Sequence, residues 1–173
     1  MTYKRGMFCG IGMIPALLLM FFPACQVKAD YTYNPNLDSG FSFNGWVGNI
    51  YDFTFGSDSV GKYGLDSTAF QFPLFLGFLG ILSSIIIGII YMAKSDSTWR
   101  TKLVETICSG VALFFMSPAF GSTAVYTFYN SLDSHYDYKK FRLGFGFVVL
   151  FIYLLIIFVC NLVALIKAKK EQF

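Results

Sequence analysis

Few residues in this 173-residue chain could carry out chemistry, and none of them forms a pattern typical of catalysis. The single histidine, His135, lies between Asp133 and Asp137, and an imidazole with two carboxylates can in principle bind zinc. These residues fall in a short polar stretch, where solvated side chains are the simpler interpretation. The sequence contains no Gly-x-Ser-x-Gly, no phosphate-binding glycine loop and no Cys-x-x-Cys. We therefore expect no enzyme, no metal site and no cofactor.

Glu105 is the only acidic residue within a long apolar stretch, and it lies at one end of that stretch. A charge in the middle of a membrane span would indicate an ion or proton path. The end position favours a carboxylate that reaches toward water or starts a helix. Asn161 is the clearest polar residue in any apolar stretch, where it can bond to a neighbouring helix or reach the membrane surface.

The four cysteines, Cys9, Cys25, Cys108 and Cys160, all lie within or beside the apolar stretches. This placement argues against a disulfide framework outside the membrane. Two interpretations remain open. The thiols pack as small apolar side chains, or Cys9, Cys108 and Cys160 are acylated near the inner membrane surface.

Four apolar stretches must position all of these side chains. They cover residues 6–27, 73–93, 103–126 and 143–166. Each has about the 20 residues that a helix needs to cross a bilayer. Hydrophobic residues make up 55% of the chain, more than a soluble domain of this size could bury. The sequence predicts one all-α membrane domain over 1–173, a four-transmembrane-helix bundle with a small extracytoplasmic β-element and extracytoplasmic loops 30–72 and 130–142.

Basic residues indicate how the bundle is oriented. Eight of the thirteen Lys and Arg fall on one side of the predicted membrane: Lys4, Arg5, Lys94, Arg100, Lys102, Lys167, Lys169 and Lys170. The positive-inside rule makes that side cytoplasmic. We therefore expect both termini in the cytoplasm and the protein in the plasma membrane. Because the basic residues are scattered along the membrane borders, the net charge of +3 does not indicate nucleic-acid binding.

Residues 1–29 allow a second interpretation, as a signal peptide. A basic start, an apolar centre and the small residues Val27 and Ala29 before Asp30 fit a cleavage site. The apolar run is longer than a usual signal core, which favours a retained span. Both interpretations remain open, and cleavage would leave three spans.

The first loop has the pattern of β structure. Phe41-Ser42-Phe43 and Tyr51–Phe55 alternate aromatic and polar side chains around Asn44-Gly45, a dipeptide typical of hairpin turns. We expect a small hairpin there whose aromatic face packs on the helices or on a partner. The residues expected to make extracellular contacts are Phe41, Phe43, Trp46, Tyr51, Phe53 and Phe55.

Small side chains recur on one face of two predicted spans, and such stripes let membrane helices approach closely. They are Gly80, Ser84 and Gly88 in the second span, and Gly110, Ser117 and Gly121 in the third. We expect the two stripes to face each other. Ser117-Pro118 should also bend the third span.

The chain ends in Lys170-Glu171-Gln172-Phe173. An acidic residue two positions before a C-terminal apolar residue can be bound by a PDZ-type groove. A basic tail lying against anionic lipid is the simpler interpretation.

Three local segments and the overall layout carry a family resemblance. Ala124-Val125-Tyr126-Thr127 ends the third span, Gly144-Phe145-Gly146-Phe147 opens the fourth, and Gly45-Trp46-Val47-Gly48 lies in the first loop. With two outer loops of unequal length and a basic tail, the whole chain resembles the claudin / peripheral myelin protein / stargazin superfamily. The paired first-loop cysteines of that family are absent here, and a MARVEL-type tetraspan fits the same topology.

The resemblance implies lateral assembly, adhesion or channel modulation. We therefore expect a non-enzymatic tetraspan protein that organises a membrane domain or cell junction by self-assembly and extracellular contacts. The alternative is an accessory subunit of a channel, transporter or larger complex. The expected partners are the lipid bilayer and either further copies of the chain or a larger membrane complex.

Overall fold

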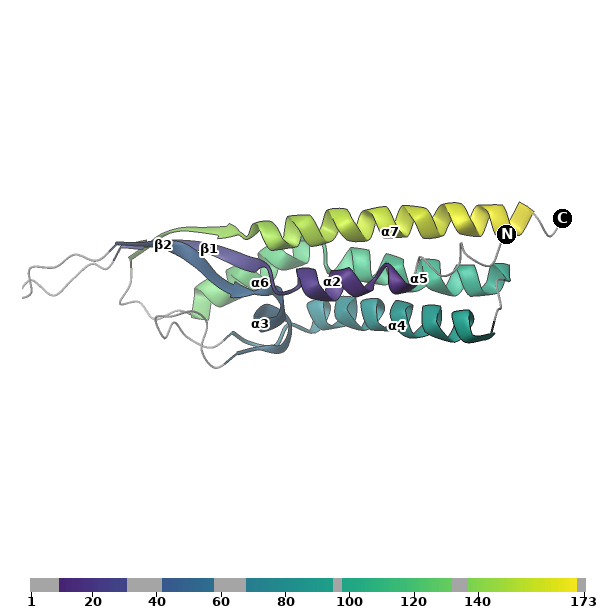
Figure 1. The fold of residues 1–173 in the computed structure, drawn as a ribbon. Helices are drawn as coiled ribbons and strands as arrows, with labels where there is room; N and C mark the ends of the chain where they lie inside the picture. Colours follow the sequence, from purple (N-terminus) through teal and green to yellow (C-terminus); the bar gives the residue numbers. More distant parts are fainter. Residues whose placement is uncertain (1–9, 31–41, 58–67, 95–97, 132–136, 171–173) are drawn as a thin grey trace, which may run out of the picture.

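The computed structural model describes residues 10–30, 42–57, 68–94, 98–131 and 137–170. The elements in chain order are α2 (Ile14–Leu19), β1 (Pro23–Asp30), β2 (Ser42–Asn49), α3 (Ile50–Phe55), α4 (Phe72–Lys94), α5 (Trp99–Phe115), α6 (Pro118–Ser131), β3 (Asp137–Leu143) and α7 (Phe145–Lys170). The long helices lie side by side along an elongated molecule, and a small sheet extends from one end (Figure 1).

Among the described residues, three helical stretches are long and apolar enough to cross a membrane: Phe72–Ala93, Trp99–Tyr129 and Phe145–Lys170. They correspond to the second, third and fourth predicted spans. On α7, Val148, Ile152 and Ile156 are between 44% and 55% exposed, and soluble proteins rarely expose large apolar patches. These helices are compatible with an integral membrane protein.

The first apolar stretch departs from the predicted span in its outer part. Helix α2 has six residues and is about 9 Å long at 1.5 Å per residue. The chain then turns and continues as strand β1 from Pro23. A proline lacks the N–H that a continuing helix needs. Segment 23–27 is therefore a strand, which corrects the prediction of a helix to Val27, and residues 6–9 lie outside the described part of the chain.

The sheet has three antiparallel strands in the order β2-β1-β3, so β1 is central. Lys28 of β1 pairs with Asn44 on one side and with Lys140 on the other. Asn44-Gly45 therefore lies within a strand, and the predicted hairpin turn at this dipeptide is wrong. The central strand instead comes from the first apolar stretch, and β3 comes from the predicted second loop.

Residues 50–55 form a helix where the sequence pattern predicted a strand. Gly48, with φ of 62°, adopts the left-handed conformation that glycine tolerates best, one residue before β2 ends. The Asn49 side chain accepts a hydrogen bond from the Asp52 N–H at 3.0 Å. The Asp52 carboxylate accepts one from the Asn49 N–H at 2.9 Å. This reciprocal capping box starts α3 and overrides the alternating pattern.

The third predicted span is interrupted near its middle. Helix α5 ends at Phe115, and α6 begins at Pro118. The fixed φ of proline suits a first helical position, whereas its ring clashes inside a helix. The bend expected at Ser117-Pro118 thus coincides with the break between α5 and α6.

One buried apolar cluster joins the sheet to the helices. Cys25 of β1, Val47 of β2, Phe53 of α3, Leu74 of α4 and Phe147 of α7 are each at most 1% exposed. The sheet and the helices therefore share a core, so the position of the sheet is fixed by packing.

The capping box predicts a specific loss of stability. Asn49→Ala removes one of the two reciprocal hydrogen bonds and should lower the free energy of unfolding by about 1 kcal/mol. Asn49→Ser keeps a capping oxygen and should retain most of the stability. Thermal unfolding of the purified protein in mild detergent measures both, and equal stability of the two variants would contradict a capping role.

Candidate functional site

The two outer strands of the sheet differ in charge. Among the described residues, β2 and β3 are its edges, because both pair only with β1. Strand β3 contains three basic residues, Lys139, Lys140 and Arg142, and one acidic residue, Asp137, whereas β2 contains no charged residue. Charged side chains on an edge strand, lysine above all, discourage the addition of another strand. The uncharged edge along Ser42–Asn49, here called the β2 edge, is therefore the one suited to accept one.

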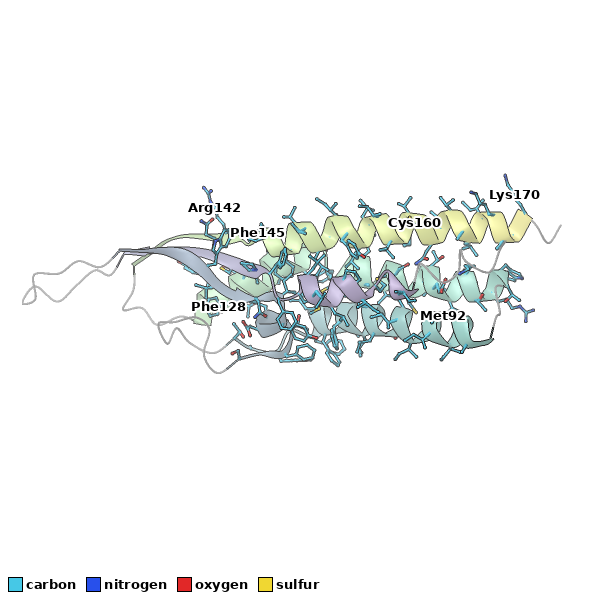
Figure 2. The ribbon with its side chains drawn as sticks, in the orientation of Figure 1. Met92, Phe128, Arg142, Phe145, Cys160 and Lys170 are labelled. Carbon is cyan, nitrogen blue, oxygen red and sulfur yellow. The ribbon has the colours of Figure 1, made fainter. Side chains whose placement is uncertain are left out.

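Trp46 lies at the junction between the sheet and the helices. Its ring meets Phe145 at the start of α7 edge-on, with centroids 5.3 Å apart, and 48% of the residue is exposed. Figure 2 shows Phe145 at this junction, close to Arg142 on β3. The predicted contact residue Trp46 is thus accessible next to the β2 edge. Phe43 lies in β2, and Phe41 lies outside the described residues.

The other predicted contact residues divide into two groups. Phe53 is 1% exposed and packs against Phe128 at 5.4 Å, so it is a core residue and not the surface contact that was predicted. Tyr51 and Phe55 stack at 5.3 Å on α3 and lie at the surface. Sequence alternation placed all three on one strand face, but the helical period of α3 separates them.

Tyr51 and Phe55 belong to a larger aromatic rim, made of Phe21, Tyr51, Phe55, Phe75 and Phe78. Neighbouring rings in this rim are 4.9–6.4 Å apart, within the range of favourable aromatic contacts. The rim joins the end of α2 to α3 and to the first turns of α4. In membrane proteins, tyrosine and tryptophan are enriched where the bilayer meets water, and Tyr51 of the rim is of this type.

The small residues of α4 contact two different neighbours. A Cβ at Gly80 would lie 2.8 Å from the Ala112 nitrogen and 3.0 Å from the Cys108 carbonyl oxygen on α5. A Cβ at Gly88 would lie 2.5 Å from the Cα of Gly10. Ser84, between them, is 1% exposed. This stripe therefore lets both α5 and the segment before α2 approach the α4 backbone.

The third-span stripe faces a different helix from the one predicted. A Cβ at Gly110 would meet the Phe158 ring at 3.2 Å, and one at Gly121 would meet Phe147 at 2.9 Å, both on α7. Ser117 lies in the turn between α5 and α6. The expectation that the two stripes face each other is wrong, because Cys108 and Ala112 form the surface of α5 that meets α4.

Polar side chains from three helices form a buried polar layer, which we define as Ser84, Lys102, Glu105, Ser109 and Asn161. The Lys102 ammonium donates to the Glu105 carboxylate at 2.8 Å, and Asn161 Nδ2 donates to Ser109 Oγ at 3.1 Å. Glu105 is 1% exposed and Lys102 is 6% exposed. Glu105 is therefore an ion-paired interior residue, which corrects the prediction that it reaches toward water. The Asn161 bond to α5 matches one of the two roles expected for it.

Three oxygens of the polar layer have no hydrogen-bond partner among the residues that the structure describes: Ser84 Oγ, Glu105 Oε1 and Asn161 Oδ1. Sequence reasoning missed this layer because Glu105 was considered alone. The spacing of Lys102, Glu105 and Ser109, three and four residues apart, places them on one helical face and was the available signal.

The cysteines differ in accessibility. Cys25 is buried in β1, and burial raises the pKa of its thiol to about 12. Cys108 is half-buried on α5, and Cys160 is exposed on α7 (Figure 2). All three are free thiols. Cys9 lies outside the described residues, and acylation of Cys9, Cys108 or Cys160 stays a prediction.

Within the described part of the chain, no group of three or more His, Cys, Asp or Glu side chains could hold a metal ion. His135 and Asp133 lie outside that part, as do the residues 171–173 on which the predicted PDZ-type contact depends. Comparisons with models of known protein families, with curated proteins and with solved structures find no match. The resemblance to claudin-like or MARVEL-type proteins therefore stays a prediction.

The backbone contact at Gly80 predicts unequal effects of two similar substitutions. Gly80→Ala forces α4 away from the α5 backbone and should lower the free energy of unfolding by roughly 1–3 kcal/mol. Gly110→Ala is the control, because its new methyl group meets only the Phe158 ring, which can shift. That control should be neutral or slightly stabilising, since alanine favours helices. Equal thermal stability of the two variants in detergent would contradict the close packing at Gly80.

The burial of Cys25 predicts slow chemical labelling. Thiolate is the form that reacts with maleimide, and with a pKa of about 12 it stays scarce at neutral pH. In the folded protein, Cys25 should remain unlabelled at pH 7, and raising the pH to 9 should bring little gain. After unfolding in SDS it should react readily. Peptide mapping by mass spectrometry measures this, and labelling at equal rates in both states would contradict the buried position.

Proposed function

We propose that this protein is a non-enzymatic integral membrane protein that organises a membrane domain or cell junction by self-assembly through its outer sheet. The observation that carries the proposal is the uncharged β2 edge, which contrasts with the basic β3 edge on the opposite side of the same sheet. An added strand gains main-chain hydrogen bonds along such an edge.

We propose four membrane spans, with the first built from the apolar stretch that contains α2. Support comes from the packing of this stretch inside the bundle. Gly10 contacts Gly88 of α4, and the Tyr153 hydroxyl of α7 donates to the Gly12 carbonyl. A stretch that fills the space between two membrane helices fits a retained span better than a cleaved signal peptide. Both termini would then be cytoplasmic, in the plasma membrane, with the layout of the claudin-like superfamily.

Strand direction favours contact between opposed membranes. Strand β1 leads away from the helices, and β2 and β3 run back toward them. Two copies in one membrane have the same orientation, so their β2 edges could pair only in parallel. Copies in two facing membranes present β2 in opposite directions, which allows antiparallel pairing, the slightly more stable kind. The β2 edge therefore supports adhesion between membranes.

Position 44 offers a test with a matched control, because Asn44 and Lys140 pair with the same residue, Lys28, on opposite sides of β1. Asn44→Lys should reduce clustering of vesicles that contain the protein, since a lysine discourages edge pairing. Asn44→Asp should also reduce clustering if two β2 edges pair, because like charges then meet. Lys140→Gln should leave clustering intact.

Two results would contradict the proposal. Unchanged clustering in both Asn44 variants would exclude the β2 edge, and increased clustering in Asn44→Asp would indicate pairing with the basic β3 edge instead. Sedimentation of each variant in detergent is the folding control.

An accessory subunit is the second proposal, and the exposed aromatic rim favours it. Phe21 is 62% exposed and Phe55 is 37% exposed at the level where a neighbouring membrane protein could dock. The native mass of the complex extracted in mild detergent separates the two functions. Multiples of the chain mass support self-assembly, and a fixed ratio to an unrelated protein supports the accessory role.

A further inference from the structure

The three unpartnered oxygens of the polar layer lie at nearly the same depth in the bundle. Gly80 contacts α5 at Cys108 and Ala112, and α4 and α5 run antiparallel. Ser84 is one helical turn further along α4, which brings it to the level of Cys108 and Glu105. Because a turn rises about 5.4 Å, Ser84 Oγ and the Glu105 carboxylate belong to the same layer.

Asn161 reaches this layer from the third helix. Its amide nitrogen is bonded to Ser109, and Ser109 is one turn from Glu105 on the same face of α5. Asn161 Oδ1, Glu105 Oε1 and Ser84 Oγ are therefore buried at one level of the bundle, on α7, α5 and α4. All three residues are 1% exposed.

Leaving these atoms unpartnered would be costly. Burying a polar group without a hydrogen bond costs roughly 2–7 kcal/mol, depending on the reference state, and the hydrocarbon of a surrounding bilayer offers no hydrogen-bond partner. Three such atoms in one layer indicate that a ligand of matching chemistry binds among them. The carboxylate oxygen and the amide oxygen are acceptors, and the serine hydroxyl can donate or accept.

The charges in the layer decide between a cation and a neutral ligand. The Lys102 ammonium already compensates the Glu105 carboxylate at 2.8 Å. An added cation would leave a net positive charge in the interior, and a buried unpaired charge is unfavourable. A water molecule donates two hydrogen bonds and accepts at least one, which matches two acceptors and one hydroxyl. Buried waters typically have two to four such partners.

We propose that the polar layer is a binding site for one ordered water molecule that joins α4, α5 and α7. The water donates to Glu105 Oε1 and Asn161 Oδ1 and accepts from the Ser84 hydroxyl. Its role is to link α4 to the hydrogen-bonded pair of α5 and α7. This inference does not depend on the proposed function of the outer sheet.

A double-mutant cycle tests the site, because Ser84 Oγ and Asn161 Oδ1 have no direct hydrogen bond in the structure. Ser84→Ala and Asn161→Leu each remove one partner of the water. If the water joins them, their effects on the unfolding equilibrium should be non-additive by about fivefold or more. Ser84→Ala combined with Thr123→Val, an exposed residue of α6, is the control and should be additive.

A structure of the full-length protein at a resolution that shows waters gives the direct test. The proposal expects density within hydrogen-bond distance of all three oxygens, and loss of that density in Ser84→Ala with Asn161→Leu. Additive effects in the cycle, or absence of density, would overturn it.

Two further outcomes would show that another group occupies this position, and either would overturn the proposal of a bound water. One is a rise in melting temperature in sodium or potassium chloride, relative to choline chloride, that Glu105→Gln abolishes. That result would identify a cation. The other is loss of the Ser84–Asn161 coupling when Tyr3, Lys4 and Arg5 are replaced by alanine, which would identify a side chain of the N-terminal segment as the donor.

Discussion

The close approach of two backbones at Gly144 and Pro23 holds the sheet and the helices together. The Gly144 N–H donates to the Ala24 carbonyl at 2.6 Å, and a Cβ at Gly144 would collide with the Pro23 carbonyl oxygen. Gly146, the second residue of α7, is also packed against Pro23. Because β1 and β3 begin and end at this contact, the sheet continues from the helices without a flexible linker. Forces on the sheet are therefore transmitted to α7.

The interior of the bundle combines two ways of joining helices. Near Gly80 the backbones of α4 and α5 are in contact, which favours dispersion interactions between the two helices. Membrane helices commonly associate in this way, because burial from lipid provides no hydrophobic driving force. One turn from Gly80, the buried side chains of Ser84 and Glu105 are polar, and an ion pair with Lys102 compensates the charge of Glu105. The small side chains determine the distance between the helices, and the polar side chains determine which of their turns lie opposite each other.

Sequence periodicity and length identified the features that depend on local physics. The spans at α4, α5–α6 and α7 and the irregularity at Ser117-Pro118 follow from apolar length and proline geometry, whereas the sequence left open whether Asn161 bonds to a neighbouring helix or reaches the membrane surface. The strand at Pro23–Asp30 could not be predicted in this way, because its pairing partners in β2 and β3 are distant in the sequence. The hairpin turn predicted at Asn44-Gly45 was wrong for the same reason. Pairing of this segment with β1 overrides its local preference for a turn. The ion pair of Glu105 could be predicted only if Lys102, three residues earlier in the chain, was considered together with it.

The charge difference between the sheet edges also limits what kind of assembly the proposed function allows. Pairing of a β2 edge with a second β2 edge is isologous and closes into a dimer, whereas pairing of β2 with β3 is heterologous and would extend into an open array. Strand addition at β3 is disfavoured by Lys139, Lys140 and Arg142. One of the two edges that an open array needs is therefore disfavoured in every copy. An isologous contact between facing membranes leaves the aromatic rim of each copy free. A junction of any size then needs a second, lateral contact within each membrane, and the exposed rings of the rim, Phe21 and Phe55, are the surface best suited to provide it.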